Sequence, residues 1–150
     1  LVGSEMCIRD RYGVSTTERK QRIEQMAERF GMEDSLNRQM VSYSHGMRQK
    51  MMVIAALVHN PPVWILDEPM TGLDPNAAYE LKKMMREHAD AGNCVFFSTH
   101  VLEVAEKLCD KIIMIRKGKD IYQGTLDELE TQHRNKSLEE IFVEMTHEEF

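Results

Sequence analysis

The sequence predicts an α/β protein with a parallel sheet preceded by a helical segment. Two short apolar runs, Val63–Leu66 and Cys94–Phe97, each end in polar residues, and a segment with helical periodicity separates them. Strands that alternate with helices are typical of parallel sheets. Two helix-like segments before residue 60 have no strand between them, which indicates a separate helical lobe.

The helical lobe begins with a predicted helix after Ser15, Thr16 and Thr17, which are residue types that favour the N-cap. Gly31 is suited to end this helix in the left-handed conformation. Its apolar residues recur at helical spacing, at Ile23, Met26, Ala27 and Phe30.

A second helix is predicted to start after Ser44 and to stop before Pro61 and Pro62. The run Val63–Leu66 follows and suits a strand buried on both faces, and Cys94–Phe97 is interpreted as a second buried strand. Asp74 and Pro75 open the helix between the two strands, with the aspartate as N-cap and the proline at the first helical position.

The remaining residues predict smaller elements. A helix is expected over residues 101–108, a hairpin over 111–116 and 120–123 with its turn at 117–119, and short helices near 126–130 and 137–145. Together these elements bring the carboxyl ends of Val63–Leu66 and Cys94–Phe97 to one edge of the sheet, where α/β proteins bind ligands.

Composition limits the classes of function. The 150 residues have a net charge of −6, which argues against nucleic acid as the main ligand because phosphate backbones attract clustered Lys and Arg. The three cysteines show no metal-binding spacing. No apolar run approaches the roughly 18 residues of a membrane span. Residues 1–11 resemble a translated sequencing adapter, and we expect them to be a non-native leader.

Asp67 and Glu68 directly follow the first predicted strand. Asp67 could hold Mg²⁺, because hard cations prefer oxygen ligands. Glu68 could polarise a water molecule for attack on a γ-phosphate. Taken alone, the pair is equally compatible with two solvated charges that end a strand.

Three further motifs surround this pair in the sequence. The stretch Tyr43–Lys50 contains Ser44, a plausible N-cap, and Gly46, which allows close approach of another group to the helix end; helix N-termini bind anions, although most capped helices bind nothing. The turn 71–74 ends in Asp74. The triplet Ser98-Thr99-His100 follows the second strand and is predicted to face the same edge as the acids.

The order and spacing of these motifs closely resemble the ATP-binding-cassette (ABC) transporter ATPases. Residues 43–47 are similar to that family's signature loop, 65–68 to its Walker B strand, 72–74 to its D-loop and His100 to its switch histidine. The form Tyr-Ser-His-Gly-Met and the ending at 137–142 resemble ABC-2-type exporters. The resemblance implies an incomplete P-loop NTPase (RecA-like) parallel sheet with an N-terminal helical subdomain.

The resemblance also implies roles for individual residues. Glu68 would activate water, His100 would contact the γ-phosphate, and Asp67 would help to hold Mg²⁺. The residues expected to bind the ATP held by a second subunit are Ser44, His45, Gly46, Met47 and Asp74. The implied partners are an integral-membrane permease and a second ABC ATPase subunit in a homodimer or heterodimer, at the cytoplasmic face of a bacterial-type membrane.

A phosphate-binding G-x-x-x-x-G-K-[ST] loop does not occur in the 150 residues; residues 118–120 lack its first glycine and its hydroxyl. We therefore expect a C-terminal part of an ABC nucleotide-binding domain that hydrolyses little or no ATP alone. The expected organisation is a helical subdomain and signature helix over 12–60, part of the catalytic core over 61–125, and C-terminal helices over 126–150.

Two alternatives remain open from the sequence. One is a soluble ABC-type ATPase that acts on ribosomes or DNA. The other is a non-enzymatic module that presents its methionine-rich helical lobe to a partner. The transported substrate and the direction of transport are not encoded in these residues.

Overall fold

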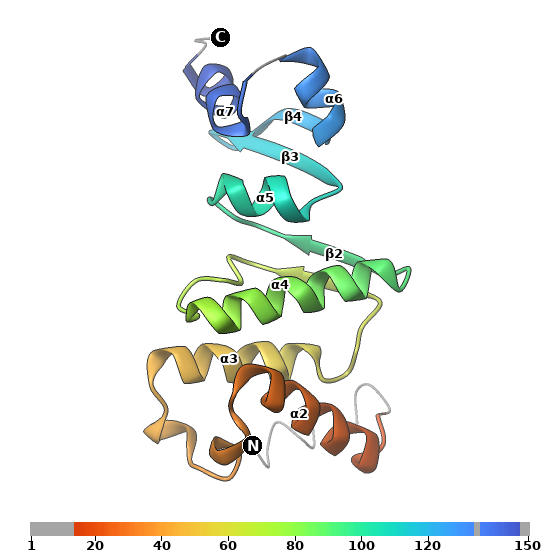
Figure 1. Cartoon of the computed structure of the whole chain (residues 1–150), viewed down its shortest axis with the longest axis vertical. Coiled ribbons are helices and arrows are strands. Elements are labelled where there is room, and N and C mark those ends of the chain that lie inside the picture. The colour runs from red at the N-terminus through yellow and green to blue at the C-terminus, as the bar shows by residue number, and fades with distance from the viewer. Residues whose placement is uncertain (1–13, 134–135, 148–150) are drawn as a thin grey trace. The chain divides into compact units, whose positions relative to one another are not determined.

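The computed structural model describes residues 14–133 and 136–147 and divides the chain into two compact units, with the boundary in the sequence between Ser98 and Thr99. Figure 1 labels most of the helices and strands within them. The first unit contains the signature-like, Walker B-like and D-loop-like motifs. The second unit begins just before His100.

The first unit opens with helix α2 (Thr16–Phe30), two short 3₁₀ helices (Glu33–Ser35 and Met40–Ser42) and helix α3 (His45–Leu57). The Ser15 hydroxyl accepts a hydrogen bond from the Glu18 N–H at 3.2 Å and starts α2. Gly31, at φ 62°, ends it. Both predicted ends are confirmed. Helices α2 and α3 pack against each other (Figure 1) through a core that includes Ala27, Phe30 and Ile54.

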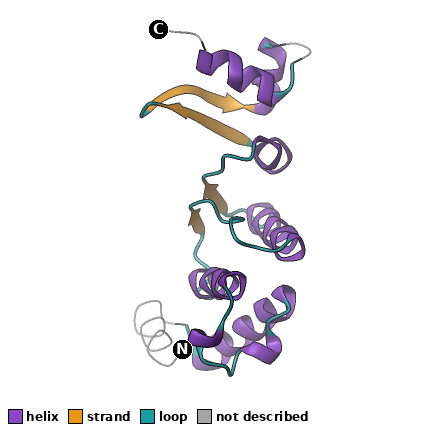
Figure 2. Ribbon diagram, turned by 90° about the vertical axis from the view of Figure 1, so that its left-hand side faces the viewer, coloured by secondary structure: helices purple, strands orange, loops and turns teal. Residues whose placement is uncertain are grey.

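Strands β1 (Val63–Leu66) and β2 (Cys94–Phe97) form a parallel pair, with Val63 opposite Cys94 and Leu66 opposite Phe97. Helix α4 (Pro75–Asp90) lies between them in sequence and packs on the pair (Figure 2). The buried Trp64 ring stacks on His88 of α4, with ring centres 4.1 Å apart. The predicted parallel α/β arrangement of these elements is confirmed.

The predictions that β1 is buried on both faces and that β2 is a buried strand are both wrong. Trp64 is buried, but Ile65 is 77% exposed and Phe96 is 58% exposed. Strand residues point alternately to opposite faces, so α4 covers the Trp64 face and leaves the Ile65 face uncovered by the described residues.

The second unit contains helix α5 (Leu102–Leu108), strands β3 (Lys111–Arg116) and β4 (Lys119–Thr125), and helices α6 (Leu126–Gln132) and α7 (Leu138–His147). The two strands form the predicted antiparallel hairpin (Figure 2). Its turn has Lys117 at φ 49° and Gly118 at φ 76°, the positive values that tight hairpin turns favour. A small core joins the hairpin to α6 and α7 and comprises Ile112, Met114, Leu129, Leu138 and Ile141.

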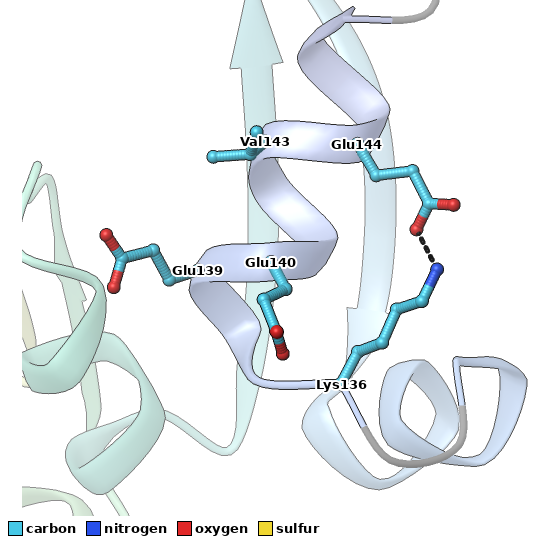
Figure 3. Close-up of a pocket in the computed structure, with 5 residues that line it drawn as sticks. All are labelled: Lys136, Glu139, Glu140, Val143 and Glu144. Atoms are coloured by element: carbon cyan, nitrogen blue, oxygen red, sulfur yellow. Dashed lines mark hydrogen bonds and ion pairs between the residues drawn. The ribbon is translucent and has the colours of Figure 1, made fainter.

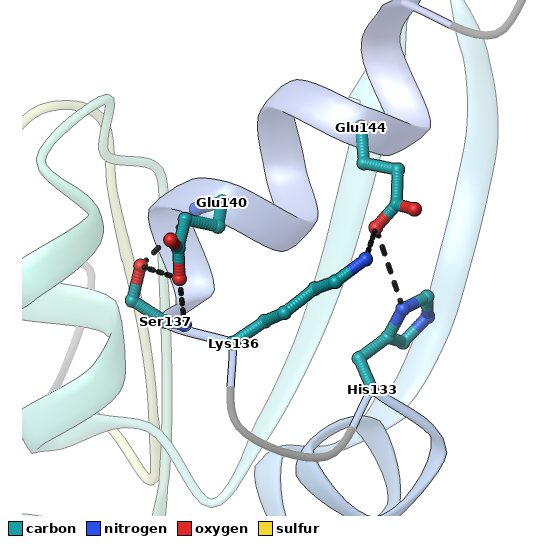
Figure 4. A network of polar contacts seen from close by, with 5 residues as sticks. All are labelled: His133, Lys136, Ser137, Glu140 and Glu144. Atoms are coloured by element: carbon teal, nitrogen blue, oxygen red, sulfur yellow. Dashed lines mark hydrogen bonds and ion pairs between the residues drawn. The ribbon is translucent and has the colours of Figure 1, made fainter.

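The start of α7 has a shallow surface hollow lined by acidic, basic and apolar side chains (Figure 3): Lys136, Glu139, Glu140, Val143 and Glu144. Three of its polar residues, Lys136, Glu140 and Glu144, are engaged in local contacts (Figure 4). The Ser137 N–H donates to Glu140 at 2.7 Å, and Lys136 pairs with Glu144 at 2.6 Å. The hydrogen bond from Lys136, together with its charge, lowers the pKa of the Glu144 carboxyl. These contacts start and brace a helix.

None of the helices described in residues 14–133 and 136–147 is both long and apolar enough to cross a membrane.

Candidate functional site

The candidate site is built on the carboxyl edge of the β1–β2 pair. Parallel pairing continues one residue past the strands, because the Ser98 N–H donates to the Leu66 carbonyl at 3.0 Å. That bond places Ser98 beside Asp67 and Glu68, the residues that follow β1. The predicted gathering of strand-end polar groups at one edge is therefore confirmed for Asp67, Glu68 and Ser98.

The Ser98 hydroxyl contacts both acidic residues. It donates to Asp67 Oδ1 at 2.5 Å and accepts the Glu68 backbone N–H at 2.9 Å. A serine hydroxyl has a single proton, so its donor capacity is committed to Asp67. The sequence indicated that Ser98 lies at this edge, but it did not indicate that one side chain bridges the two acids.

Glu68 adopts a left-handed backbone conformation, with φ 44°. This conformation costs a residue other than glycine about 1–2 kcal/mol. The chain turns sharply here, since the Thr71 N–H donates to the Glu68 carbonyl at 3.0 Å. Strained residues persist where the surroundings hold them, and they cluster at functional sites. The geometry therefore singles out Glu68 within the edge.

The signature-like residues form the start of α3. Ser44 is the N-cap, and its hydroxyl accepts the Met47 N–H at 3.2 Å. The hydroxyl proton is not used by this bond, so Ser44 can still donate to an anion. Helix α3 has no acidic residue in its first turn, whereas α2, α6 and α7 do. The positive end of its dipole therefore has no acidic side chain in that turn.

The start of α3 packs closely on the turn before α4. Gly72 has φ 80°, and a Cβ at this position would lie 2.8 Å from the Nε2 atom of His45. A Cβ on Gly46 would lie 3.3 Å from the Gly72 carbonyl oxygen. Both glycines thus permit a contact that a larger residue would push apart. The structure brings His45 and Gly46 together with the D-loop-like turn.

An ion pair joins the same two segments deeper in the fold. Lys50 Nζ lies 2.6 Å from Asp74 Oδ2, and its side chain is only 15% exposed. Lys50 also donates to the Phe30 carbonyl at 3.1 Å. Asp74 caps α4 by accepting the Ala77 N–H at 3.0 Å. Lys50 and that N–H together lower the pKa of the Asp74 carboxyl.

Asp74 was predicted as the α4 N-cap, and this is confirmed. Lys50 was missed by the reasoning from sequence. The available signal was weak: a lysine in the second turn of a helix, where its charge opposes the helix dipole, suggests a specific acidic partner.

His100 belongs to the second unit and lies in the turn before α5. The hydroxyl of its neighbour Thr99 accepts the Val101 N–H at 3.1 Å, which shapes this turn. The expectation that His100 acts beside Asp67 and Glu68 stays a prediction.

The donor set fits Mg²⁺ in a limited way. Mg²⁺ is often bound through one or two carboxylates, with waters and substrate phosphates as the other ligands. Asp67 is exposed and engages Ser98 through Oδ1, which leaves Oδ2 for a cation. A group of three or more His, Cys, Asp or Glu side chains suited to a metal does not occur among the described residues. Only a site completed by phosphate and water is compatible with this edge.

Comparisons with known proteins show the family of the chain. A family model described as ABC transporter matches residues 1–71. The chain is 39% identical over 132 residues to the ABC transporter ATP-binding protein NatA of Bacillus subtilis (strain 168), which covers 88% of this chain and 54% of NatA. It is 35% identical over 119 residues to the daunorubicin/doxorubicin resistance ATP-binding protein DrrA of Streptomyces peucetius, covering 79% of this chain and 36% of DrrA.

The fold has a match among solved structures as well. A structure of the ATP-binding subunit of an ABC transporter superposes with a TM-score of 0.87 at 35% identity, over 96% of this chain and 61% of that one. The chain spans about half the length of NatA, one of the curated relatives that it matches.

Fold and site together define part of a P-loop NTPase-type α/β nucleotide-binding domain. The chain belongs to the ATP-binding proteins of ABC transporters.

Proposed function

We propose that the whole protein is the ATP-hydrolysing subunit of an ABC-2-type exporter, acting as one half of a head-to-tail dimer. The observation that carries this proposal is the packing within the first unit. The start of α3 rests on the turn before α4, and that turn follows directly from the acids at the end of β1. Three motifs that the resemblance assigns to ATP binding and to the dimer interface are thus joined within the first unit.

Glu68 would accept a proton from the attacking water. A general base must be held in a fixed orientation within hydrogen-bond reach of that water. The left-handed conformation at Glu68 and the bond from its N–H to Ser98 fix its backbone. His100 would contact the γ-phosphate from the turn before α5.

Asp67 would hold Mg²⁺ through its free carboxylate oxygen. The cation would supply charge neutralisation for the phosphates when bound. The protein's own part is to keep the carboxylate in place, through the Ser98 hydroxyl.

The start of α3 would close over ATP bound by the partner subunit. Ser44 supplies a hydroxyl proton, and Gly46 allows the close approach of a phosphate to the helix end. His45 and Met47 replace commoner residues at this end and would shape the same contact. Asp74, paired with Lys50 and with the Ala77 N–H of the same chain, would couple the position of α3 to the turn before α4, which we place at the dimer interface.

The permease, the cytoplasmic face of the membrane and the export direction are parts of this proposal. The name of DrrA associates that relative with drug resistance, which supports export. The net charge of −6 favours this assignment over an ABC-type ATPase that acts on DNA or ribosomes.

We further propose that the 150 residues alone hydrolyse little or no ATP. They contain no G-x-x-x-x-G-K-[ST] loop, so no lysine and glycine-rich backbone of that kind is present to bind the β- and γ-phosphates.

The test is ATP hydrolysis by the intact protein, with and without Mg²⁺, together with its mass by sedimentation in the presence of ATP. We expect Mg²⁺-dependent hydrolysis and an ATP-dependent dimer. An intact protein that binds ATP nowhere would contradict the proposal and favour a non-enzymatic module. Robust hydrolysis by the 150 residues alone would contradict the second part.

A further inference from the structure

We infer that Ser98 is a positioning residue for the proposed hydrolysis: its hydroxyl holds the carboxylate of Asp67 and the backbone of Glu68 in one fixed arrangement. This inference rests on the proposed function and deepens it. It concerns a residue that none of the motif resemblances assigns, since the switch-histidine motif contributes His100 and not the residue two positions earlier.

The Ser98 hydroxyl forms hydrogen bonds with both acidic residues. Ser98 Oγ donates to Asp67 Oδ1 and accepts from the Glu68 N–H. Because the donor and an acceptor site are both used, rotation of the hydroxyl is restrained from two directions. The bond to a carboxylate is charge-assisted and therefore stronger than one between neutral groups.

The pairing of β1 with β2 places the Ser98 hydroxyl beside the two acids. The Ser98 N–H is bonded to the Leu66 carbonyl, one residue before Asp67. The main chain of Ser98 is thereby fixed to the strand that carries the acids. Its side chain therefore acts from main chain that is hydrogen-bonded to β1, which favours accurate orientation of a neighbouring group.

The Ser98 hydroxyl restrains each of the two acids in a different way. Asp67 is exposed, so without the bond its carboxylate would be free to change rotamer, and the other oxygen would no longer face one direction. Glu68 has an unfavourable backbone conformation, and the Ser98 bond satisfies the N–H within that conformation. Loss of the hydroxyl would affect both residues together.

The test compares Ser98→Ala with Ser98→Thr in the intact protein. Alanine removes the hydroxyl, while threonine keeps it and adds a methyl group at an exposed position. We expect Ser98→Ala to lower kcat by about 10-fold or more, as for other partners that orient a metal ligand. The KM for ATP should change less than kcat, and the Mg²⁺ concentration for half-maximal rate should rise. Ser98→Thr should retain wild-type values.

Amide hydrogen exchange at Glu68 provides a readout that does not depend on activity. We expect the Glu68 N–H to exchange faster in Ser98→Ala than in the wild type or in Ser98→Thr. Unchanged exchange in Ser98→Ala would overturn the inference, whether or not the protein hydrolyses ATP.

Two kinetic outcomes would also overturn it: wild-type kcat in Ser98→Ala, or an equal loss in Ser98→Thr, since the hydroxyl would then not be what matters. These results differ from failure of the proposed function, in which the wild type itself would not hydrolyse ATP.

Discussion

Polar side chains are used differently in the two units. In the first unit they start helices and also join segments that are distant in sequence: Ser98 bonds Asp67, and Lys50 pairs with Asp74. In the second unit, Thr125 with Glu128 and Ser137 with Glu140 join residues three positions apart. The contacts between distant segments set the arrangement of the motif-bearing loops, whereas the contacts between residues three positions apart start helices. Polar side chains thus define local structure in both units, and in the first unit they also define tertiary geometry.

The largest effect on stability is expected where the α3 start meets the turn before α4. Gly72→Ala should destabilise the first unit by about 1–3 kcal/mol, because a positive φ is combined with a clash against His45. Gly92→Ala is the matched control: Gly92 has φ 85° but no atom within 4 Å of an added Cβ. Urea unfolding of both variants measures the difference.

If the clash is the extra cost, adding His45→Ala to Gly72→Ala should bring the stability back to that of Gly92→Ala. Equal stability of the two single variants would show that the contact between the α3 start and the turn contributes nothing.

A smaller effect is expected from the ion pair of Lys50 and Asp74. A double-mutant cycle with Lys50→Met and Asp74→Asn should give a coupling of about 1 kcal/mol, since the lysine is largely buried and the aspartate is half exposed. Asparagine still caps α4, so the cycle isolates the ion pair. The exposed i,i+4 pair of Glu103 and Lys107 is the control and should show a smaller coupling than the pair of Lys50 and Asp74.

The coupling should depend on pH. The folded protein has a lowered Asp74 pKa, so the contribution to stability is complete above the ordinary value of 3.8. It should be lost as the pH falls through the lower folded pKa. Coupling that stays constant into that acid range would contradict the assigned pair.

The smallest effect is expected from a local cap. Thr125→Ala should destabilise α6 by about 0.5 kcal/mol, because the capping box with Glu128 is exposed. Thr131→Ala is the control, since its hydroxyl bonds the Asp127 carbonyl within the same helix and caps no N–H. Helix fraying is best measured by amide exchange at residues 126–129. Faster amide exchange in the first unit as well would contradict the view that the Thr125 cap acts only on local structure.

The sequence predicted those features that local chemistry decides. The caps at Ser15, Ser44 and Asp74, and the end at Gly31, were predictable because each depends on a few adjacent residues. The carboxylates after β1 were predictable because acids that end an apolar run mark a strand edge.

Features that depend on distant segments were not predictable. The exposure of Ile65 depends on what covers the second face of the strand, and an apolar run alone contains no such information. The bridge from Ser98 to Asp67 required the register that sets Leu66 opposite Phe97. Lys50 required knowledge of which turn lies beside α3.

The central claim is that Glu68 at the end of β1 has a chemical role, in contrast to the acids that cap or brace helices. Hydrolysis of ATP by the intact protein tests it most directly, with Glu68→Gln compared against Glu139→Gln on the exposed side of α7. We predict that kcat falls about 10³-fold in Glu68→Gln, the range for loss of a general base, and stays at the wild-type value in Glu139→Gln. Loss of a general base lowers kcat by about 10²–10⁴-fold. A kcat in Glu68→Gln within about twofold of the wild-type value, which is far smaller than this range, would contradict the account.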